Sequence, residues 1–138
     1  MLPRFSATSY DHTEYVPAHN YINGQWQAPT GERNDPIINP RHGKAISTVG
    51  YSCAADIDAA VAAAKAALPA WQAMPIRERA QVMYKAREIM VRDLDELSWL
   101  VSHENGKLFG EAKAEVLKGI ECVEFGCSLP NLCLLYTS

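Results

Sequence analysis

HENGKLFGEAKAEVLKGIECVEFGCSLP, residues 103–130, is the stretch that says most about how this chain folds. Its apolar residues recur at helical spacing and predict one face of an amphipathic helix, made of Ala112, Val116, Ile120 and Val123. Asn105 and Gly106 stand just before this helix, and a glycine there takes the left-handed conformation that ends a helix without strain. The stretch therefore predicts the end of one helix followed directly by another.

Three helices are predicted in all between Ser52 and Gly106. The first has Asp56 and Asp58 in its opening turn, where carboxylates interact favourably with the helix dipole, and its apolar face comprises Ile57, Val61, Ala64 and Leu68. The second starts at Pro75, which suits a first helical position, and its face comprises Val82, Ala86, Ile89 and Met90. The face of the third comprises Leu94, Leu97, Leu100 and Val101.

The part of the chain before these helices is predicted to be rich in β-structure. Residues 1–18 show no periodicity and predict a flexible lead, so we expect order to begin near Asn20. Asn23 and Gly24 both tolerate positive φ, which predicts a two-residue hairpin turn between residues 21–22 and 25–26. Residues 36–40 and 44–49 predict two further short strands.

Composition narrows the class of protein. The chain has 138 residues, of which 48% are hydrophobic and 21% charged, as expected for one globular domain. A net charge of -3 argues against nucleic-acid binding, which needs clustered Lys and Arg. No apolar run reaches the roughly 20 residues of a membrane span, so we expect no membrane partner.

The compartment is predicted from the cysteines and the first residues. Asp11 and Glu14 come too early for a typical mitochondrial presequence, which favours a cytoplasmic location. The cysteines lack the paired spacing of a zinc site and predict buried free thiols in a reducing cytosol; they are Cys53, Cys122, Cys127 and Cys133.

Residues able to carry chemistry are present but are not arranged in a recognised motif. Gly106 and Gly110 do not follow a strand and so do not predict a phosphate loop. The four histidines are scattered and lack the HExxH spacing of a metalloprotease. Glu111 and Glu115 share a helix face, but lysines alternate with them, and this pattern is typical of a solvated face.

Several landmarks in order resemble the aldehyde dehydrogenase family over residues 20–132. NYINGQW resembles its opening hairpin, IINPRHGKAISTVGY its next two strands, DIDAAVAAAKAALPAW its first helix, and RERAQVMYKAREIMVRDLDELSWLVSHENGK its second and third helices. EVLKGIECVEFGCSLP is most similar to the CoA-acylating methylmalonate-semialdehyde dehydrogenase branch. The resemblance implies an α/β fold, of which this chain is the N-terminal portion: a β-hairpin and short strands followed by about four amphipathic helices.

The same resemblance implies a parent enzyme that assembles into homo-oligomers and takes NAD and coenzyme A as cofactors. In that family a cysteine attacks a small aldehyde substrate, hydride passes to NAD, and the acyl group leaves to CoA or, in other branches, to water. No cysteine here lies in a setting like the family's nucleophile motif, so we predict no catalytic and no cofactor-binding residue and expect the fragment alone to be inactive.

Two sites follow from the resemblance by position. Lys118 stands where the acylating branch has an arginine implicated in holding the substrate carboxylate; lysine keeps the charge but loses the bidentate geometry. A surface lysine paired with Glu115 or Glu121 is the alternative. A monovalent cation bound by the carbonyl of Ile38 and the carboxylate of Glu104 is the second site, and a simple helix-end carboxylate is its alternative.

The domain prediction is a lead at 1–18, the family segment at 19–132, and a tail at 133–138. The ending LCLLYTS departs from the family and resembles read-through of an adapter or vector. Two other functions stay open: a fragment of a hydrolytic aldehyde dehydrogenase, and a non-catalytic helical interaction domain. The substrate, the need for CoA and the oligomeric state do not follow from the sequence.

Overall fold

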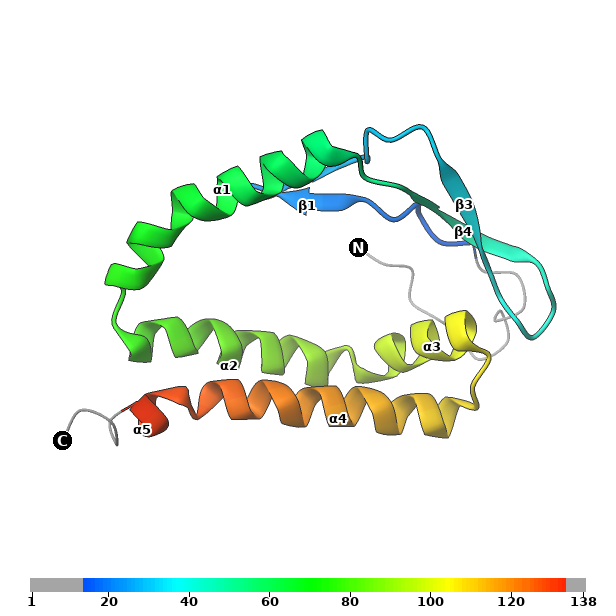
Figure 1. Cartoon of the computed structure of the whole chain (residues 1–138). Helices are drawn as coiled ribbons and strands as arrows, with labels where there is room; N and C mark the ends of the chain where they lie inside the picture. The colour runs from blue at the N-terminus through cyan, green and yellow to red at the C-terminus, as the bar shows by residue number, and fades with distance from the viewer. Residues whose placement is uncertain (1–13, 134–138) are drawn as a thin grey trace. The chain divides into compact units, whose positions relative to one another are not determined.

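The computed structural model describes residues 14–133, with four strands followed by five helices (Figure 1). The predicted lead up to residue 13 and the predicted tail from residue 134 lie outside the described residues. The chain divides into two compact units, Met1–Ala70 and Trp71–Ser138. The first contains the strands and most of helix α1, and the second contains the remaining helices.

The first unit opens with the predicted hairpin. Strands β1 (Asn20–Ile22) and β2 (Gln25–Gln27) pair antiparallel, with Tyr21 opposite Trp26. Asn23 and Gly24 have φ values of 50° and 77°, as the two central residues of a type I′ turn require. The prediction of this hairpin is therefore confirmed down to its turn.

Strands β3 (Asn34–Ile38) and β4 (Ala45–Gly50) form a second antiparallel pair, with an irregularity between Ile37 and Ile38. Both strands were predicted, but the first was placed two residues too late. Asn39 belongs to the connecting turn, where it is 3% exposed and its Oδ1 accepts a hydrogen bond from the Arg41 N–H at 2.9 Å. This local bond competes with strand pairing and ends β3 before Asn39.

Residues 14–18 run beside β4. The N–H of Tyr15 donates to the carbonyl of Ile46 at 2.7 Å, and the N–H of Ala18 donates to the carbonyl of Thr48 at 3.0 Å. Ala18 forms a parallel bridge with Val49. Among the described residues, backbone pairing is thus already present at Tyr15, which corrects the expectation that order begins near Asn20. The domain boundary at residue 18 stays a prediction.

Helix α1 (Ala54–Ala73) confirms the predicted helix from Ser52 onward, but none of its 20 residues is buried. Its predicted apolar face stays partly exposed: Ile57 is 58% exposed and Leu68 is 47% exposed. The β1–β2 hairpin borders this face, since Ile57 and Val61 line one hollow with strand β1. Ala64 lines a second hollow of about 390 Å³ with the hairpin, together with Ala60, Ala63 and Ala67.

The second unit is a set of packed helices: α2 (Ile76–Arg92), α3 (Leu94–Asn105), α4 (Phe109–Cys127) and the short α5 (Leu129–Cys133). α4 packs along both α2 and α3 (Figure 1). Its predicted apolar face is confirmed, since Ala112 and Ile120 are 0% and 5% exposed. Gly106 ends α3 with φ of 70°, as expected of a left-handed cap. Helix α5 was not predicted.

The predicted face of α2 is confirmed only in part: Ala86 and Met90 are half-buried, and a Cβ added to Gly119 of α4 would lie 3.8 Å from the Met90 Cε. Val82 and Ile89 are 54% and 41% exposed, whereas Ala80 is buried and Met83 lies half-buried on the same face. The reason is that apolar residues occur on more than one side of α2, so periodicity alone does not select the packed side. Met83 belongs to the contact with α4, where a Cβ added to Gly126 would lie 2.7 Å from the Met83 Cε.

The observed architecture is the predicted mixed α/β one, with short antiparallel strand pairs preceding the helices. The core is small in both units. The buried apolar side chains among the described residues are Ile46, Ala80, Ala112, Ile120 and Cys127. Unlike Cys127, Cys122 is exposed and Cys53 is intermediate, so the prediction of uniformly buried thiols is wrong for these two residues.

Candidate functional site

Lys118 lies on the exposed side of α4. Its side chain is 72% exposed, and its Nζ donates a hydrogen bond to Oε2 of Glu121, one turn further along the same helix. This hydrogen bond, together with the charge of Glu121, raises the pKa of Lys118 above its usual value. The geometry corresponds to the surface pairing given as the alternative for this residue, with Glu121 rather than Glu115 as its partner.

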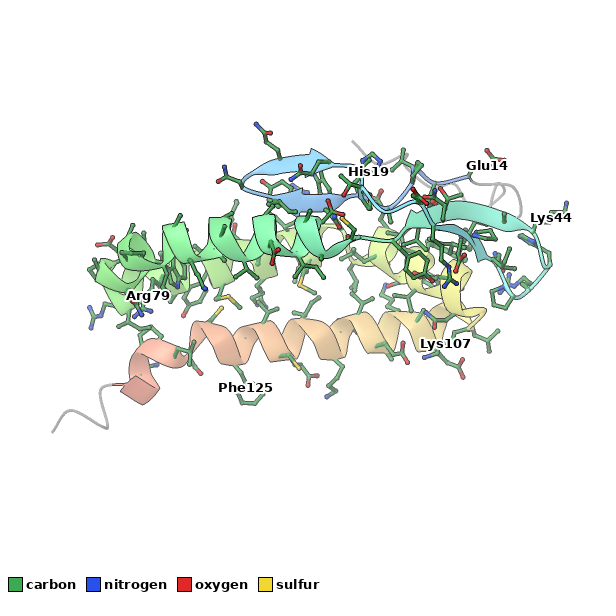
Figure 2. All side chains as sticks on the ribbon, turned by 45° about the horizontal axis from the view of Figure 1, so that its top comes forward. Glu14, His19, Lys44, Arg79, Lys107 and Phe125 are labelled. Atoms are coloured by element: carbon green, nitrogen blue, oxygen red, sulfur yellow. The ribbon has the colours of Figure 1, made fainter. Side chains whose placement is uncertain are left out.

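Two lysines at and just before the start of α4 also form ion pairs. Lys107 donates to Oε1 of Glu115, so its partner is not Glu111, the residue at the i, i+4 position. Figure 2 shows Lys107 near the beginning of α4, next to the connection from α3. Lys113 reaches across to Asp95 of α3 at 2.7 Å. Glu111 and Glu115 are both exposed, which supports their interpretation as part of a solvated face.

The two residues predicted to bind a cation occur in different units. Ile38 is the last residue of β3 in the first unit and is 42% exposed. Glu104 is exposed near the end of α3 in the second unit. Because the two residues belong to separate units, the structure provides no argument for or against a shared site. Cation binding by this pair stays a prediction.

A polar cluster that the sequence did not predict joins the segment after β2 to the start of α1. The Thr30 N–H and the Cys53 N–H both donate to Oδ2 of Asp56, at 3.0 and 2.9 Å. The Thr30 hydroxyl donates to Oδ1 of Asp56 at 2.9 Å and lies 3.0 Å from Sγ of Cys53. Asp56 thus reaches back to the residue that precedes the helix, as the acidic member of a capping box does.

These hydrogen bonds change the acidity of two groups. The backbone N–H of Thr30, followed by that of Cys53, stabilises the charged carboxylate and lowers the pKa of Asp56. The Thr30 hydroxyl is the main cause that lowers the pKa of the Cys53 thiol, assisted by backbone N–H groups of Asp56 and Ala55. We assign the cluster a structural role, because its members chiefly bind one another.

The sequence carried a partial signal for this cluster. Asp56 was recognised as a first-turn carboxylate, but Thr30 lies 26 residues away and periodicity does not link the two. Gly31 allows the segment that carries Thr30 to come close to the segment before α1, because a Cβ at Gly31 would lie 2.1 Å from the Tyr51 carbonyl oxygen. The chain between β2 and β3 therefore approaches the backbone before α1 more closely than a side chain would permit.

Among residues 14–133, no group of three or more His, Cys, Asp or Glu side chains is placed to hold a metal ion. None of the helices in this part has the length and apolar character needed to cross a lipid bilayer.

Comparison with known proteins identifies the family. The model of the Aldehyde dehydrogenase family matches residues 26–133. Malonate-semialdehyde dehydrogenase 3 of Geobacillus kaustophilus (strain HTA426) is 41% identical over 120 residues, which are 87% of this chain and 25% of the relative. Malonate-semialdehyde dehydrogenase of Bacillus pumilus (strain SAFR-032) is 42% identical over the same shares of the two chains.

Solved structures agree with this family. A protein from Sinorhizobium meliloti 1021, solved with NAD under the name of a methylmalonate-semialdehyde dehydrogenase, superposes with a TM-score of 0.79 and 35% identity over 87% of this chain and 24% of its own. An NAD-dependent benzaldehyde dehydrogenase from Corynebacterium glutamicum gives a TM-score of 0.78 and 29% identity over 82% of this chain and 25% of its own. The chain, which spans about a quarter of the length of these relatives, belongs to the aldehyde dehydrogenase family.

Proposed function

We propose that this chain is the N-terminal part of an NAD-dependent dehydrogenase that oxidises malonate or methylmalonate semialdehyde to an acyl-CoA. The observation that carries the proposal is the identity of 40% to 42% with malonate-semialdehyde dehydrogenases of Geobacillus and Bacillus species. In this reaction the aldehyde is oxidised, NAD accepts the hydride, and coenzyme A receives the acyl group. We further propose that the complete enzyme is a cytoplasmic homo-oligomer.

The binding of NAD is proposed to depend on parts of the fold outside residues 14–133. Within the described residues the strands form two antiparallel pairs, whereas a dinucleotide is typically bound by a parallel βαβ unit with a glycine-rich turn. We therefore assign no NAD-binding or CoA-binding residue to this chain. Its contribution is structural, with one residue proposed to contact the substrate.

Lys118 is that residue, and its role would be to hold the carboxylate of the semialdehyde. Its present partner, Glu121, lies on the same helix and is itself 55% exposed at the side chain. Exposed ion pairs of this kind are worth only about 0 to 1 kcal/mol. A substrate carboxylate can therefore replace Glu121 at little cost if the complete enzyme encloses this side of α4.

A monovalent cation held by the carbonyl of Ile38 and the carboxylate of Glu104 is proposed as a stabilising ligand. Oxygen ligands suit a hard cation, and Glu104 takes part in no ion pair within the described part of the chain.

Melting temperatures in potassium, sodium and tetramethylammonium chloride at equal ionic strength test the cation site. We expect a cation-dependent difference that Glu104→Gln abolishes; equal melting temperatures in all three salts argue against it.

A chimera tests the proposed activity. Residues 1–131 of this chain replace the aligned part of malonate-semialdehyde dehydrogenase 3 of Geobacillus kaustophilus, and formation of NADH and acyl-CoA is measured with malonate semialdehyde. The unmodified relative is the positive control. We expect CoA-dependent oxidation by the chimera and none by the 138-residue chain alone.

The other outcomes separate the alternatives. Oxidation that yields a free acid without any need for CoA favours a hydrolytic enzyme. A chimera that is folded and oligomeric like the control but oxidises no aldehyde rejects the proposal and favours a non-catalytic interaction domain.

A further inference from the structure

We propose that Glu121 determines specificity at the Lys118 site: it competes with the substrate carboxylate for the Lys118 ammonium and so limits the affinity of the enzyme for acidic aldehydes. This inference rests on the proposed contact between Lys118 and the semialdehyde. A neutral aldehyde has no carboxylate and is unaffected by the competition. Glu121 thus sets how strongly the site prefers acidic over neutral aldehydes.

Lys118 and Glu121 form a pair of their own on the exposed side of α4. Nζ of Lys118 donates a hydrogen bond to Oε2 of Glu121, and neither side chain takes part in another ion pair among the residues that the structure describes. The two positions lie about one turn apart on the same helix. The carboxylate of Glu121 therefore stays near the ammonium even when the hydrogen bond between them is broken.

The neighbouring acidic residues of α4 have other partners. Glu115 accepts a hydrogen bond from Lys107, which precedes the helix. Glu124 accepts one from an arginine of α2 at 2.7 Å. Of these three glutamates, only Glu121 is paired with Lys118, so the competition for its ammonium is assigned to Glu121.

The charge of Glu121 affects carboxylate binding without deciding the charge of Lys118. The hydrogen bond and the charge of Glu121 raise the pKa of Lys118, but an unpaired lysine is also protonated at pH 7. A substrate carboxylate that shares the ammonium with Glu121 meets a like charge. One that displaces Glu121 breaks an exposed ion pair, which is worth up to about fivefold in affinity. Both routes weaken the binding of acidic aldehydes.

Kinetics of the chimera described above test the competition. Glu121→Gln keeps the size of the side chain and its hydrogen-bond acceptor and removes only its charge. We expect this variant to lower the Michaelis constant for malonate semialdehyde about two- to fivefold, while kcat and the constants for acetaldehyde stay unchanged. Glu88→Gln is the matched control, because Glu88 forms the same kind of exposed i, i+3 pair with Lys85 on α2, and it is expected to change neither substrate's constants.

Two further variants show how Glu121 acts. In a Lys118→Ala background, Glu121→Gln is expected to change the Michaelis constant less than about twofold, because no ammonium is left to compete for. Glu121→Ala separates competition from positioning: loss of a competitor lowers the Michaelis constant, whereas loss of a residue that holds Lys118 in place raises it. Circular dichroism and the oligomeric state of each variant are compared with those of the unmodified chimera.

The pair is also testable in the 138-residue chain, independently of activity. Mass spectrometry follows the acetylation of each lysine by an activated ester at pH 8. Since the pair keeps Lys118 protonated, Glu121→Gln is expected to speed acetylation of Lys118 about twofold relative to the exposed Lys44. An unchanged rate means that the pair does not form in solution and overturns the proposal.

The kinetic outcomes separate this inference from the proposed function. If Lys118→Ala selectively impairs oxidation of malonate semialdehyde but Glu121→Gln has no effect, only the role of Glu121 is rejected. An increased Michaelis constant with Glu121→Ala, or an equal change for acetaldehyde, rejects it as well. Equal effects of Lys118→Ala on both aldehydes reject the substrate contact of Lys118 and the competition with it.

Discussion

Replacing Gly119 of α4 by alanine is expected to stabilise the helical unit by about 1 kcal/mol. A glycine inside a helix costs about 0.8 to 1.0 kcal/mol relative to alanine. The added Cβ would lie 3.8 Å from the Cε of Met90, the nearest atom, which is an ordinary van der Waals distance. The helix gains the full difference in propensity because nothing has to move.

Gly126 of the same helix provides the matched comparison. An added Cβ there would lie 2.7 Å from the Met83 Cε and 3.5 Å from its Cγ, so the Met83 side chain must leave its position. Moving a side chain off its preferred rotamer costs about 0.5 to 1.5 kcal/mol. This cost offsets the gain in propensity, and we expect Gly126→Ala to be neutral or destabilising by up to about 1 kcal/mol.

Urea unfolding followed by circular dichroism distinguishes the two variants. With a slope of about 1 to 2 kcal/mol per molar urea, a gain of about 1 kcal/mol raises the midpoint by roughly 0.5 to 1 M. Comparison at one fixed protein concentration keeps association constant between variants. If Gly119→Ala shows no increase, or if Gly126→Ala gains as much as Gly119→Ala, the described packing of α4 against α2 is wrong.

Four further outcomes follow from the site and the fold. Gly31→Ala is expected to prevent correct folding of the first unit, because the added Cβ would lie 2.1 Å from a backbone oxygen; a native-like circular dichroism spectrum and melting curve argue against this close approach. Asp56→Asn is expected to lower the melting temperature at pH 7. Because the folded-state pKa of Asp56 is lowered from the ordinary 3.8, its contribution is present above that value and disappears as the pH falls through the folded-state pKa. The melting temperatures of the variant and the unmodified chain should therefore converge in acid, and a constant difference contradicts the assignment. In the active chimera, Lys118→Ala is expected to raise the Michaelis constant for malonate semialdehyde about 10- to 100-fold, the equivalent of a charge-assisted hydrogen bond, while acetaldehyde is little affected; equal effects on both substrates leave Lys118 as a surface charge. The chain alone is expected to show no saturable NAD binding by calorimetry, and measurable binding contradicts the proposed division of roles.

The sequence predicted those features of the fold that depend on residues close together in the chain. The hairpin at Asn23 and Gly24 was predictable because positive φ at two adjacent residues is itself a turn signal. The left-handed end of α3 at Gly106 and the buried stripe of α4 were predictable for similar reasons, the second because Ala112 and Ile120 belong to an apolar series at helical spacing.

Features that depend on a residue or element far away in the sequence could not be predicted from the sequence alone. α2 offers apolar residues on several sides, and the choice of the side carrying Met83 is made by α4 rather than by α2 itself. The contact of Thr30 with Asp56 joins residues far apart in sequence. For Lys118, the resemblance to the acylating branch suggests a substrate contact, whereas its pairing with Glu121 suggests a surface charge. Parts of the enzyme outside residues 14–133 decide between the two roles.

The pairing of residues 14–18 with β4 also bears on resistance to aggregation. It occupies one side of β4 while β3 occupies the other, so neither edge of this strand is available as a template for another chain. Within the described residues the outer side of β3 pairs with no strand, but Pro36 in the middle of β3 lacks the N–H that a growing ladder needs. The second strand pair is thus protected against edge-to-edge growth.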